Sequence, residues 1–362
     1  MLKILDRYII KKYIFTFLFT VMIFTMISMI IDFSDKVEDF IEEPVTIRQI
    51  LVDYYLNYIL YINGLLIPLY ALISVIFFTS RMAYNSEVIS MLNAGISFRR
   101  LMLPYLVAGS LIAGFHLLSN HFLIPLGNKT RLDFEHTYIW KYSDKGKTND
   151  VHLFVSPDTK VYIKYYRKRD TSARDFRIEQ VVDNKLVYLL KAKRAEWIGL
   201  PSRWRLHNYE IRTFDGSEET VELGQGKYID TTLNLRPEDF IRYQNHKEMM
   251  DTPSLKAFIK NERTRGIGNT KVYDIEKYRR TSEPFTILIL TVIGLAVASR
   301  KVRGGMGLHL ALGVAIGATF IFLSRFSIVF ASNESLSPFL GVWIPNIIFS
   351  VVALLLVRNA QK

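Results

Sequence analysis

Hydrophobic and polar positions divide the chain into three stretches. Long apolar runs fill residues 13–124 and 284–357, and the stretch between them is dense in charge. A membrane-crossing helix needs about 20 mostly apolar residues, because lipid offers no partner to unpaired peptide groups. Six segments meet this requirement and are expected to span the membrane: 13–31, 55–79, 101–124, 284–299, 308–331 and 339–357.

The middle stretch alternates apolar and polar residues with the period of half-buried strands. This pattern runs through residues 150–235, for example in KVYIKYY and KLVYLLKA, and turn signals such as Asp183-Asn184 and Asp215-Gly216 interrupt it. It predicts an antiparallel sandwich, jelly roll or barrel. Residues 254–266 predict an amphipathic helix. The fold class is therefore a six-helix membrane protein with an inserted β domain.

The domain organisation follows from these elements. Residues 1–124 hold the first three membrane helices and a short surface helix at about 84–95. Residues 125–280 form the inserted β domain, and residues 281–362 hold the last three membrane helices.

Orientation follows from Lys and Arg in the short loops, since cytoplasmic flanks carry the excess. With the N-terminus inside, the inner flanks hold twelve: Lys3, Arg7, Lys11, Lys12, Arg81, Arg99, Arg100, Arg300, Lys301, Arg303, Arg358 and Lys362. The short outer loops hold two, Lys36 and Arg48, beside six acids between Asp32 and Glu43. Both termini are therefore expected in the cytoplasm and residues 125–280 in the periplasm of a Gram-negative cell, which makes this a multi-pass inner-membrane protein.

Composition narrows the chemistry. The chain is 50% hydrophobic, and it has no cysteine, which excludes disulfides, thiolate nucleophiles and Cys-ligated metals. The basic N-terminus resembles a signal peptide, but its apolar run is long and no cleavage site follows, so it predicts a retained helix. Residues 125–280 contain 31 Lys and Arg against 23 Asp and Glu. This excess serves either solubility or contact with an anionic partner.

The sequence lacks the motifs of an enzyme. No G-x-x-x-x-G-K-[ST], HExxH or GxSxG occurs in the chain. We expect a non-catalytic protein with no catalytic, cofactor or metal site of its own and no nucleic-acid partner. The histidines His116 and His121, near the outer end of the third helix, predict interfacial packing.

The loop between the second and third helices, RMAYNSEVISMLNAGISFRRLM, predicts a short helix at the membrane surface. Asn85 or Ser86 caps its start and Gly95 stops it. Glu87 lies in the first turn, where the helix dipole favours a carboxylate. Two interpretations stay open: a stabilising N-terminal acid, or a coupling helix that fits a groove on a cytoplasmic motor.

The fifth membrane helix carries two further candidates. GVAIG, with Gly313 and Gly317, is a small-xxx-small pattern that permits close helix packing, either structural or at a gate. Arg325 is a cation in an apolar helix, and such a residue faces a cavity, a partner or the headgroups, or extends outward to water.

Four short strings and one proline give the chain a resemblance to a known family. They are ILDRYI (4–9), SEVISMLNAGIS (86–97), IPLGNKTR (124–131), NLRPEDF (234–240) and the entry to helix four at Pro284. In this order and spacing they resemble the LptF/LptG (YjgP/YjgQ) permeases of lipopolysaccharide export. The LDRYI opening looks more like the LptG branch.

The resemblance implies an ABC-transporter permease that extracts lipopolysaccharide from the outer leaflet of the inner membrane. It implies an LptF-like permease partner and an LptB-like ATPase dimer that binds ATP and Mg. It also implies a periplasmic β-jellyroll that passes lipid to LptC-like and LptA-like proteins and so toward the outer membrane.

The resemblance, taken with the patterns above, gives the candidate site residues. The ATPase-coupling candidates are Glu87, Ser86, Asn85, Arg99 and Arg100, and Glu87 matches the family's coupling glutamate. The lipopolysaccharide-binding candidates are Lys36, Lys129, Arg131 and Arg325, and the candidates for lateral-gate packing are Gly313 and Gly317. Acids surround Lys36, which departs from the family's basic outer end of helix one.

Two functions of other classes stay open. A receptor or scaffold would use the outer domain to bind a ligand, but the chain has no cytoplasmic output domain. An autonomous secondary transporter would carry midplane ion sites, but neither inverted repeats nor intramembrane carboxylate pairs are evident.

Overall fold

The computed structural model describes residues 3–140, 149–167, 169–216, 218–240, 245–266, 270–300, 305–333 and 335–360, apart from the side chain of Glu238. Contacts divide the chain into two compact units. The helical unit comprises Met1–Ile139, Glu248–Pro253 and Lys271–Lys362, and the sheet unit comprises Trp140–Lys247 and Ser254–Thr270.

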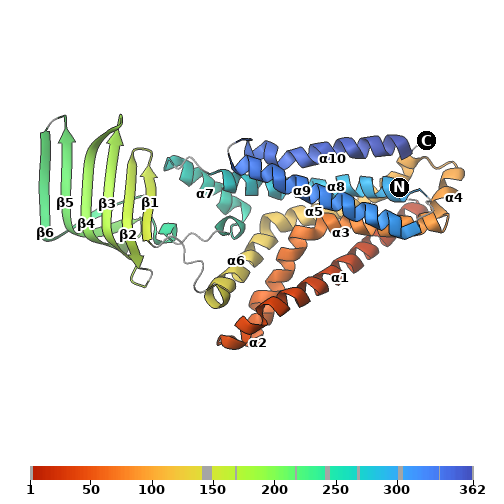
Figure 1. Ribbon diagram of the computed structural model, residues 1–362, viewed down its shortest axis with the longest axis horizontal. Helices are drawn as coiled ribbons and strands as arrows, with labels where there is room; N and C mark the ends of the chain where they lie inside the picture. The colour runs from red at the N-terminus through yellow and green to blue at the C-terminus, as the bar shows by residue number, and fades with distance from the viewer. Residues whose placement is uncertain are drawn as a thin grey trace. The chain divides into compact units, whose positions relative to one another are not determined.

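The helical unit is built from long helices (Figure 1). In chain order they are α1 (Ile4–Glu42), α2 (Ile47–Gln49), α3 (Leu56–Tyr84), α4 (Glu87–Asn93), α5 (Phe98–Leu118), α6 (Ile124–Phe134), α8 (Lys271–Ala298), α9 (Gly305–Ser332) and α10 (Pro338–Ala360). π-Helical turns extend some of these, namely η1 (Ile50–Tyr55), η2 (Ser119–Leu123) and η3 (Glu135–Ile139). Six continuous helices in the described residues are long and apolar enough to cross a membrane, which confirms the six predicted spans.

The second, third and fourth spans extend beyond their apolar segments. The third continues through α6 and η3 to Ile139, and the fourth begins at Lys271. Residues 125–139 and 271–280 therefore belong to the helical unit, so the compact sheet unit is smaller than the stretch 125–280. Ion pairs four residues apart, such as Arg131–Glu135 at 2.9 Å and Arg280–Glu276 at 3.0 Å, support these polar helical turns. Hydropathy does not register such turns.

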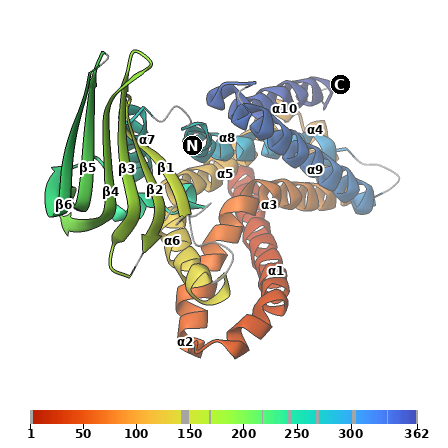
Figure 2. The ribbon, with the colours of Figure 1, turned by 60° about the vertical axis from the view of Figure 1, so that its left-hand side comes forward.

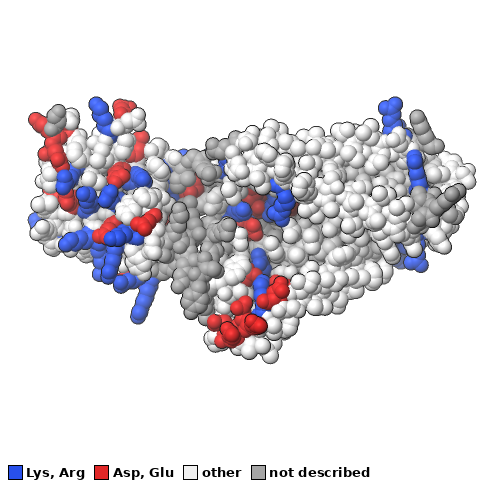
Figure 3. All heavy atoms as spheres, viewed as in Figure 1, with Lys and Arg blue, Asp and Glu red and all other residues white. Residues whose placement is uncertain are grey.

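Charge and burial are distributed unevenly over the helical unit. On the face seen in Figure 3, the middle of the unit shows no charged side chain, and charges gather toward its two ends. Within the unit, α3, α5 and α8 form the core, where buried Tyr13 of α1 bonds Thr291 of α8 at 2.9 Å. In the apolar segments of α1 and α9 only 17% of the residues are buried, against 33–61% of the residues in the other four spans.

The sheet unit contains six antiparallel strands that lie side by side in one sheet (Figure 2). They are β1 (Asn149–Ser156), β2 (Thr159–Arg167), β3 (Ser172–Val182), β4 (Lys185–Gly199), β5 (Arg203–Asp215) and β6 (Glu218–Thr232). The antiparallel pairing predicted from the alternation is confirmed, and Asp183 and Asn184 form a tight turn with φ of 49° and 60°. Consecutive strands are neighbours, so the described sheet is a meander. Its likeness to a jelly roll lies in the antiparallel strands and not in crossover connections.

One face of the sheet is closed by the chain that follows it. Trp204 is fully buried and donates from its indole nitrogen to the carbonyl of Leu235 at 2.9 Å. Phe240, at the end of η4 (Pro237–Phe240), packs edge-on against the same ring. After η5 (His246–Glu248), α7 (Thr252–Thr264) realises the predicted amphipathic helix, and Arg265 beyond its end pairs with Asp239 at 2.9 Å.

Candidate functional site

The short helix α4 lies at the end of the helical unit that also holds both termini (Figure 1). We call this the α4 end. Glu87 begins α4 and accepts a hydrogen bond from the hydroxyl of Tyr8 at 3.3 Å. Val88 is buried, while Ile89 and Leu92 are 39% and 37% exposed. The helix is thus anchored by one side chain and presents an apolar surface beside its carboxylate.

The predicted caps of α4 are only partly realised. Ser86 takes the N-cap position with φ of 63°, but its side chain forms no capping hydrogen bond, and Asn85 instead ends α3. Gly95 follows α4 with φ of 82°, a conformation that favours glycine and that stops the helix as predicted.

The two adjacent arginines after α4 have different surroundings. Arg99 is exposed. Arg100 donates two hydrogen bonds of 2.7 Å to the carboxylate of Asp6, whose side chain is 2% exposed. This bidentate pair connects the start of α1 to the start of α5. Arg100 therefore makes a contact within the chain, whereas Arg99 is exposed. Sequence reasoning missed Asp6, although it is the single acid in the basic N-terminal segment.

At the opposite end of the helical unit, which we call the α2 end, a buried ionic network joins α1, η1 and α6. Lys36 lies 2.8 Å from Asp32 and 3.0 Å from Glu135, and it also bonds the hydroxyl of Tyr54. Arg131 lies 2.9 Å from Glu135. One carboxylate at the end of α6 therefore holds two cations that are expected to bind lipid.

The three basic candidates at this end are not equivalent. Lys36 and Arg131 are 17% and 7% exposed in their side chains, and the guanidinium of Arg131 also stacks on Tyr61 at 4.1 Å. Lys129 is exposed. Sequence reasoning missed Glu135, which is detectable as an acid four residues after Arg131 on a helix.

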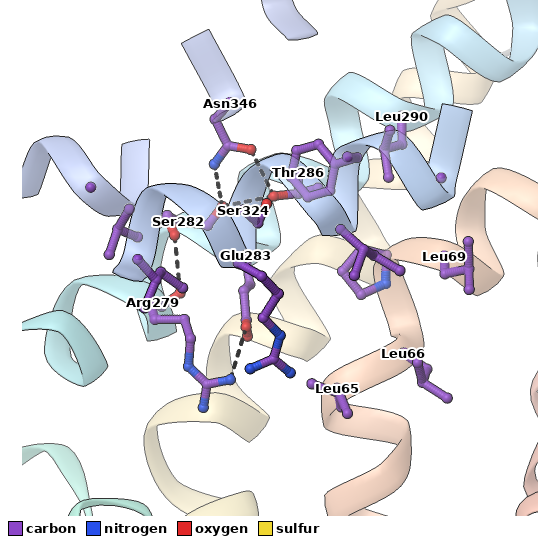
Figure 4. Close-up of a pocket in the computed structure, with 18 residues that line it drawn as sticks. Leu65, Leu66, Leu69, Arg279, Ser282, Glu283, Thr286, Leu290, Ser324 and Asn346 are labelled. Carbon is purple, nitrogen blue, oxygen red and sulfur yellow. Dashed lines mark hydrogen bonds and ion pairs between the residues drawn. The ribbon is translucent and has the colours of Figure 1, made fainter. Parts of the chain in front are cut away.

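A cavity of about 180 Å³ lies among α3, α8, α9 and α10 (Figure 4). Leucines of α3 and aromatic and aliphatic side chains of α9 line it, together with Arg325. The labelled polar side chains come mainly from α8, where Arg279 pairs with Glu283 at 3.3 Å and with Glu276 at 2.9 Å. Arg325 has no ion-pair or hydrogen-bond partner among the described residues. The cavity thus combines an apolar wall with an uncompensated cation.

Gly313 and Gly317 of α9 pack against α3. A Cβ on Gly313 would lie 2.4 Å from Ile76 Cδ1, and one on Gly317 would lie 2.6 Å from Leu69 Cδ1. Both glycines therefore permit close approach, as the pattern predicts, and the helix they contact is α3 of the same chain.

Comparison of the sequence with known families gives one match. The sequence matches the family model "Lipopolysaccharide export system permease LptF/LptG" over residues 7–359. No curated protein matches the chain significantly. The match covers all six spans and the inserted sheet, and it does not distinguish LptG from LptF. Since the match spans nearly the whole sequence, the chain belongs to the LptF/LptG family of lipopolysaccharide export permeases.

Proposed function

We propose that this chain is one permease subunit of an ABC transporter that extracts lipopolysaccharide from the outer leaflet of the inner membrane. It works beside an LptF-like or LptG-like permease and is driven by an LptB-like ATPase dimer that binds ATP and Mg. In this proposal the α4 end faces the cytoplasm and the sheet unit lies in the periplasm, where it hands lipid to LptC-like and LptA-like proteins.

The observation that carries this proposal is the shallow burial of α1 and α9. Within the chain, only 17% of the residues in each of their apolar segments are buried. Large side chains on α9 remain exposed, among them Phe322 at 69% and Phe326 at 51%. These two helices are therefore available to a second permease and to acyl chains, as a lateral gate requires.

The free-energy cost of exposing acyl chains to water is the reason that such a gate is needed. Each CH₂ group returned to water costs about 0.8 kcal/mol, so a lipid with several acyl chains cannot leave the bilayer through water. An apolar chamber between two permeases avoids that exposure. The cavity that Arg325 lines is large enough only for part of such a lipid, and the second permease supplies the remaining wall.

The cations at the α2 end give the proposal a phosphate-binding element. Lys129 is exposed and ready to bind a phosphate. Lys36 and Arg131 are held by Asp32 and Glu135, so they bind a phosphate only in exchange for a carboxylate. Substrate binding thereby loosens the contact between α1 and α6.

The α4 end provides the coupling to the motor. Glu87, Ile89 and Leu92 form a small knob on the surface, and the ATPase receives it in a groove. The bond from Tyr8 to Glu87 and the pair of Asp6 with Arg100 connect this knob to α1, so closure of the motor reaches the gate.

The test is lipopolysaccharide release from vesicles that contain the complete transporter. Glu87→Ala should retain lipopolysaccharide binding and lose ATP-dependent release, by about tenfold or more if one charge-assisted hydrogen bond to the ATPase is removed.

Ser90→Ala is the matched control, because Ser90 is an exposed residue of the same helix. Its release should equal that of the unaltered protein. Unchanged release by Glu87→Ala would remove the coupling role, and release without any ATPase would overturn the transporter proposal.

A further inference from the structure

A second hollow, separate from the cavity near Arg325, lies at the α4 end of the helical unit. It has a volume of about 350 Å³ and is lined by α1, the last turns of α3 and the first residue of α4. We call it the α1–α3 groove. Its side chains include Lys12 and Arg81 at one end and Phe15, Phe19 and Phe77 along its length.

The polarity of the α1–α3 groove changes along the helix axes. On α1, Phe19 lies two turns beyond Lys12, or about 10 Å further toward the middle of the helix. On α3, which runs in the opposite direction (Figure 1), Phe77 lies one turn before Arg81. Both cations therefore sit at the same end of the groove, and the aromatic side chains extend from there toward the middle of the helical unit.

The described part of the chain forms no ion pair with the cations at this end. The side chains of Lys12 and Arg81 are exposed, and neither has an ion pair or hydrogen bond among the described residues. The ammonium of Lys12 lies 5.7 Å from the ring centre of Tyr8. Among the described residues that line the groove, Glu87 is the one carboxylate, and it accepts a hydrogen bond from Tyr8. The end of the groove carries two positive charges and one negative charge.

The aromatic side chains of the groove are also left exposed by the chain. Phe15 is 72% exposed, Phe19 49% and Phe77 39%. In a chain that spans a membrane, such a surface meets acyl chains, and a cationic end at the level of the headgroups meets phosphate. The cationic end and the apolar length of the α1–α3 groove are complementary to an amphiphile with a negatively charged head.

We propose that the α1–α3 groove is a binding site for an anionic glycerophospholipid such as phosphatidylglycerol. Lys12 and Arg81 bind the phosphodiester, and one acyl chain lies along Phe15, Phe19 and Phe77. The site is distinct from the lipopolysaccharide path, because it occupies the opposite end of α1 from Lys36 and Arg131. A lipid bound there contacts α1 and α3 together and so stabilises the packing of these two helices.

The test measures lipid retained by the purified transporter complex after incubation with equal amounts of phosphatidylglycerol and phosphatidylcholine. Mass spectrometry then quantifies both lipids. Both lipids carry a phosphodiester, but the ammonium of choline cancels its charge in phosphatidylcholine. Lys12 and Arg81 are therefore expected to favour phosphatidylglycerol by about tenfold or more. The double variant Lys12→Gln, Arg81→Gln should retain the two lipids almost equally.

The matched control is Arg7→Gln, Lys11→Gln. It removes the same charge from exposed positions of α1 that do not line the groove. It should keep the preference of the unaltered protein within about twofold, because the groove is intact. If both double variants lost the preference for phosphatidylglycerol equally, the effect would be one of general surface charge and the proposal would be overturned. An unchanged preference in the Lys12→Gln, Arg81→Gln variant would also overturn it.

A second measurement needs no charge-removing variant. A photoreactive amino acid placed at Phe19 should form adducts with phosphatidylglycerol in the assembled transporter. Adducts with the second permease or the ATPase instead would show that a protein occupies the groove, and they would overturn the proposed lipid site. Neither readout uses lipopolysaccharide or ATP, so failure here leaves the proposed export function standing.

Discussion

Arg325 lies in an apolar helix with the exposed rings of Phe322 and Phe326 nearby on the same helix, and no described carboxylate neutralises it. An isolated guanidinium in such surroundings is costly unless it meets an anion or water. We expect Arg325→Gln to lower the lipopolysaccharide retained by the purified complex by about tenfold, the loss of one charge-assisted hydrogen bond.

Arg325→Lys serves as the comparison for this prediction, because it keeps the charge and loses only the planar fork of donors. It should retain most of the bound lipid. Equal retention by the unaltered protein and both variants would show that Arg325 faces only water or headgroups.

Glu135 is the residue on which the ionic network at the α2 end depends, since it contacts both Lys36 and Arg131. Its side chain is 1% exposed, and removing one partner of a buried ion pair is strongly destabilising. Glu135→Gln should therefore lower the melting temperature of the purified protein. It should also raise the retention of phosphorylated lipid, because two cations are released.

Asp133→Asn is the control for Glu135, because Asp133 is an exposed acid on the same helix. It should change neither the melting temperature nor the retained lipid. If Glu135→Gln lowered lipid retention without loss of fold, Glu135 would support the phosphate site directly, and exchange between carboxylate and phosphate would be wrong.

At the scale of elements, α1 packs on the rest of the helical unit through apolar side chains such as Ile9 and Phe17, and ion pairs near its two ends add to this packing. At the α4 end, the pair of Asp6 with Arg100 is the strongest of these contacts by geometry. Asp6→Asn and Arg100→Gln should each lower the melting temperature, and the double variant should lower it by less than the sum.

The same variants test the connection between α4 and α1. Because Arg100 belongs to the predicted coupling set but bonds Asp6, both single variants should reduce the lipid released per ATP hydrolysed and leave ATPase binding intact. If the changes in melting temperature were additive and the lipid released per ATP were normal, the pair of Asp6 with Arg100 would contribute nothing to stability or coupling.

The sequence predicts elements better than it predicts their partners. Six apolar runs and the alternation of residues 150–235 identify the spans and strands, since each pattern reports burial of a helix or strand face. The polar turns of α6 and α8 carry neither pattern, because ion pairs four residues apart support them instead of apolar burial.

The sequence predicts where the candidate site residues lie, but it does not predict which of them form ion pairs. Glu87 and Lys129 lie on the surface as a motif alone implies. The pairing of Lys36, Arg100 and Arg131 with carboxylates depends on contacts between distant segments, such as Asp6 with Arg100, and a single sequence does not contain that information.

For the whole molecule, the proposed export mechanism requires that the α4 end and the sheet unit lie on opposite sides of the membrane. Work done by a motor on Glu87 then reaches the lipid only through the helices. The charge pattern of the loops supports this arrangement, with twelve Lys and Arg on one set of short flanks and two on the other.

Site-directed labelling in intact cells tests this claim most directly. The chain contains no cysteine, so each introduced thiol reports one position. Thr220→Cys on β6 and Ser90→Cys on α4 are both exposed and are labelled with a maleimide that cannot cross the inner membrane. The proposed topology predicts labelling at position 220 in spheroplasts, and labelling at position 90 only after the membrane is opened. Labelling at position 90 in closed spheroplasts, with position 220 protected, would contradict it.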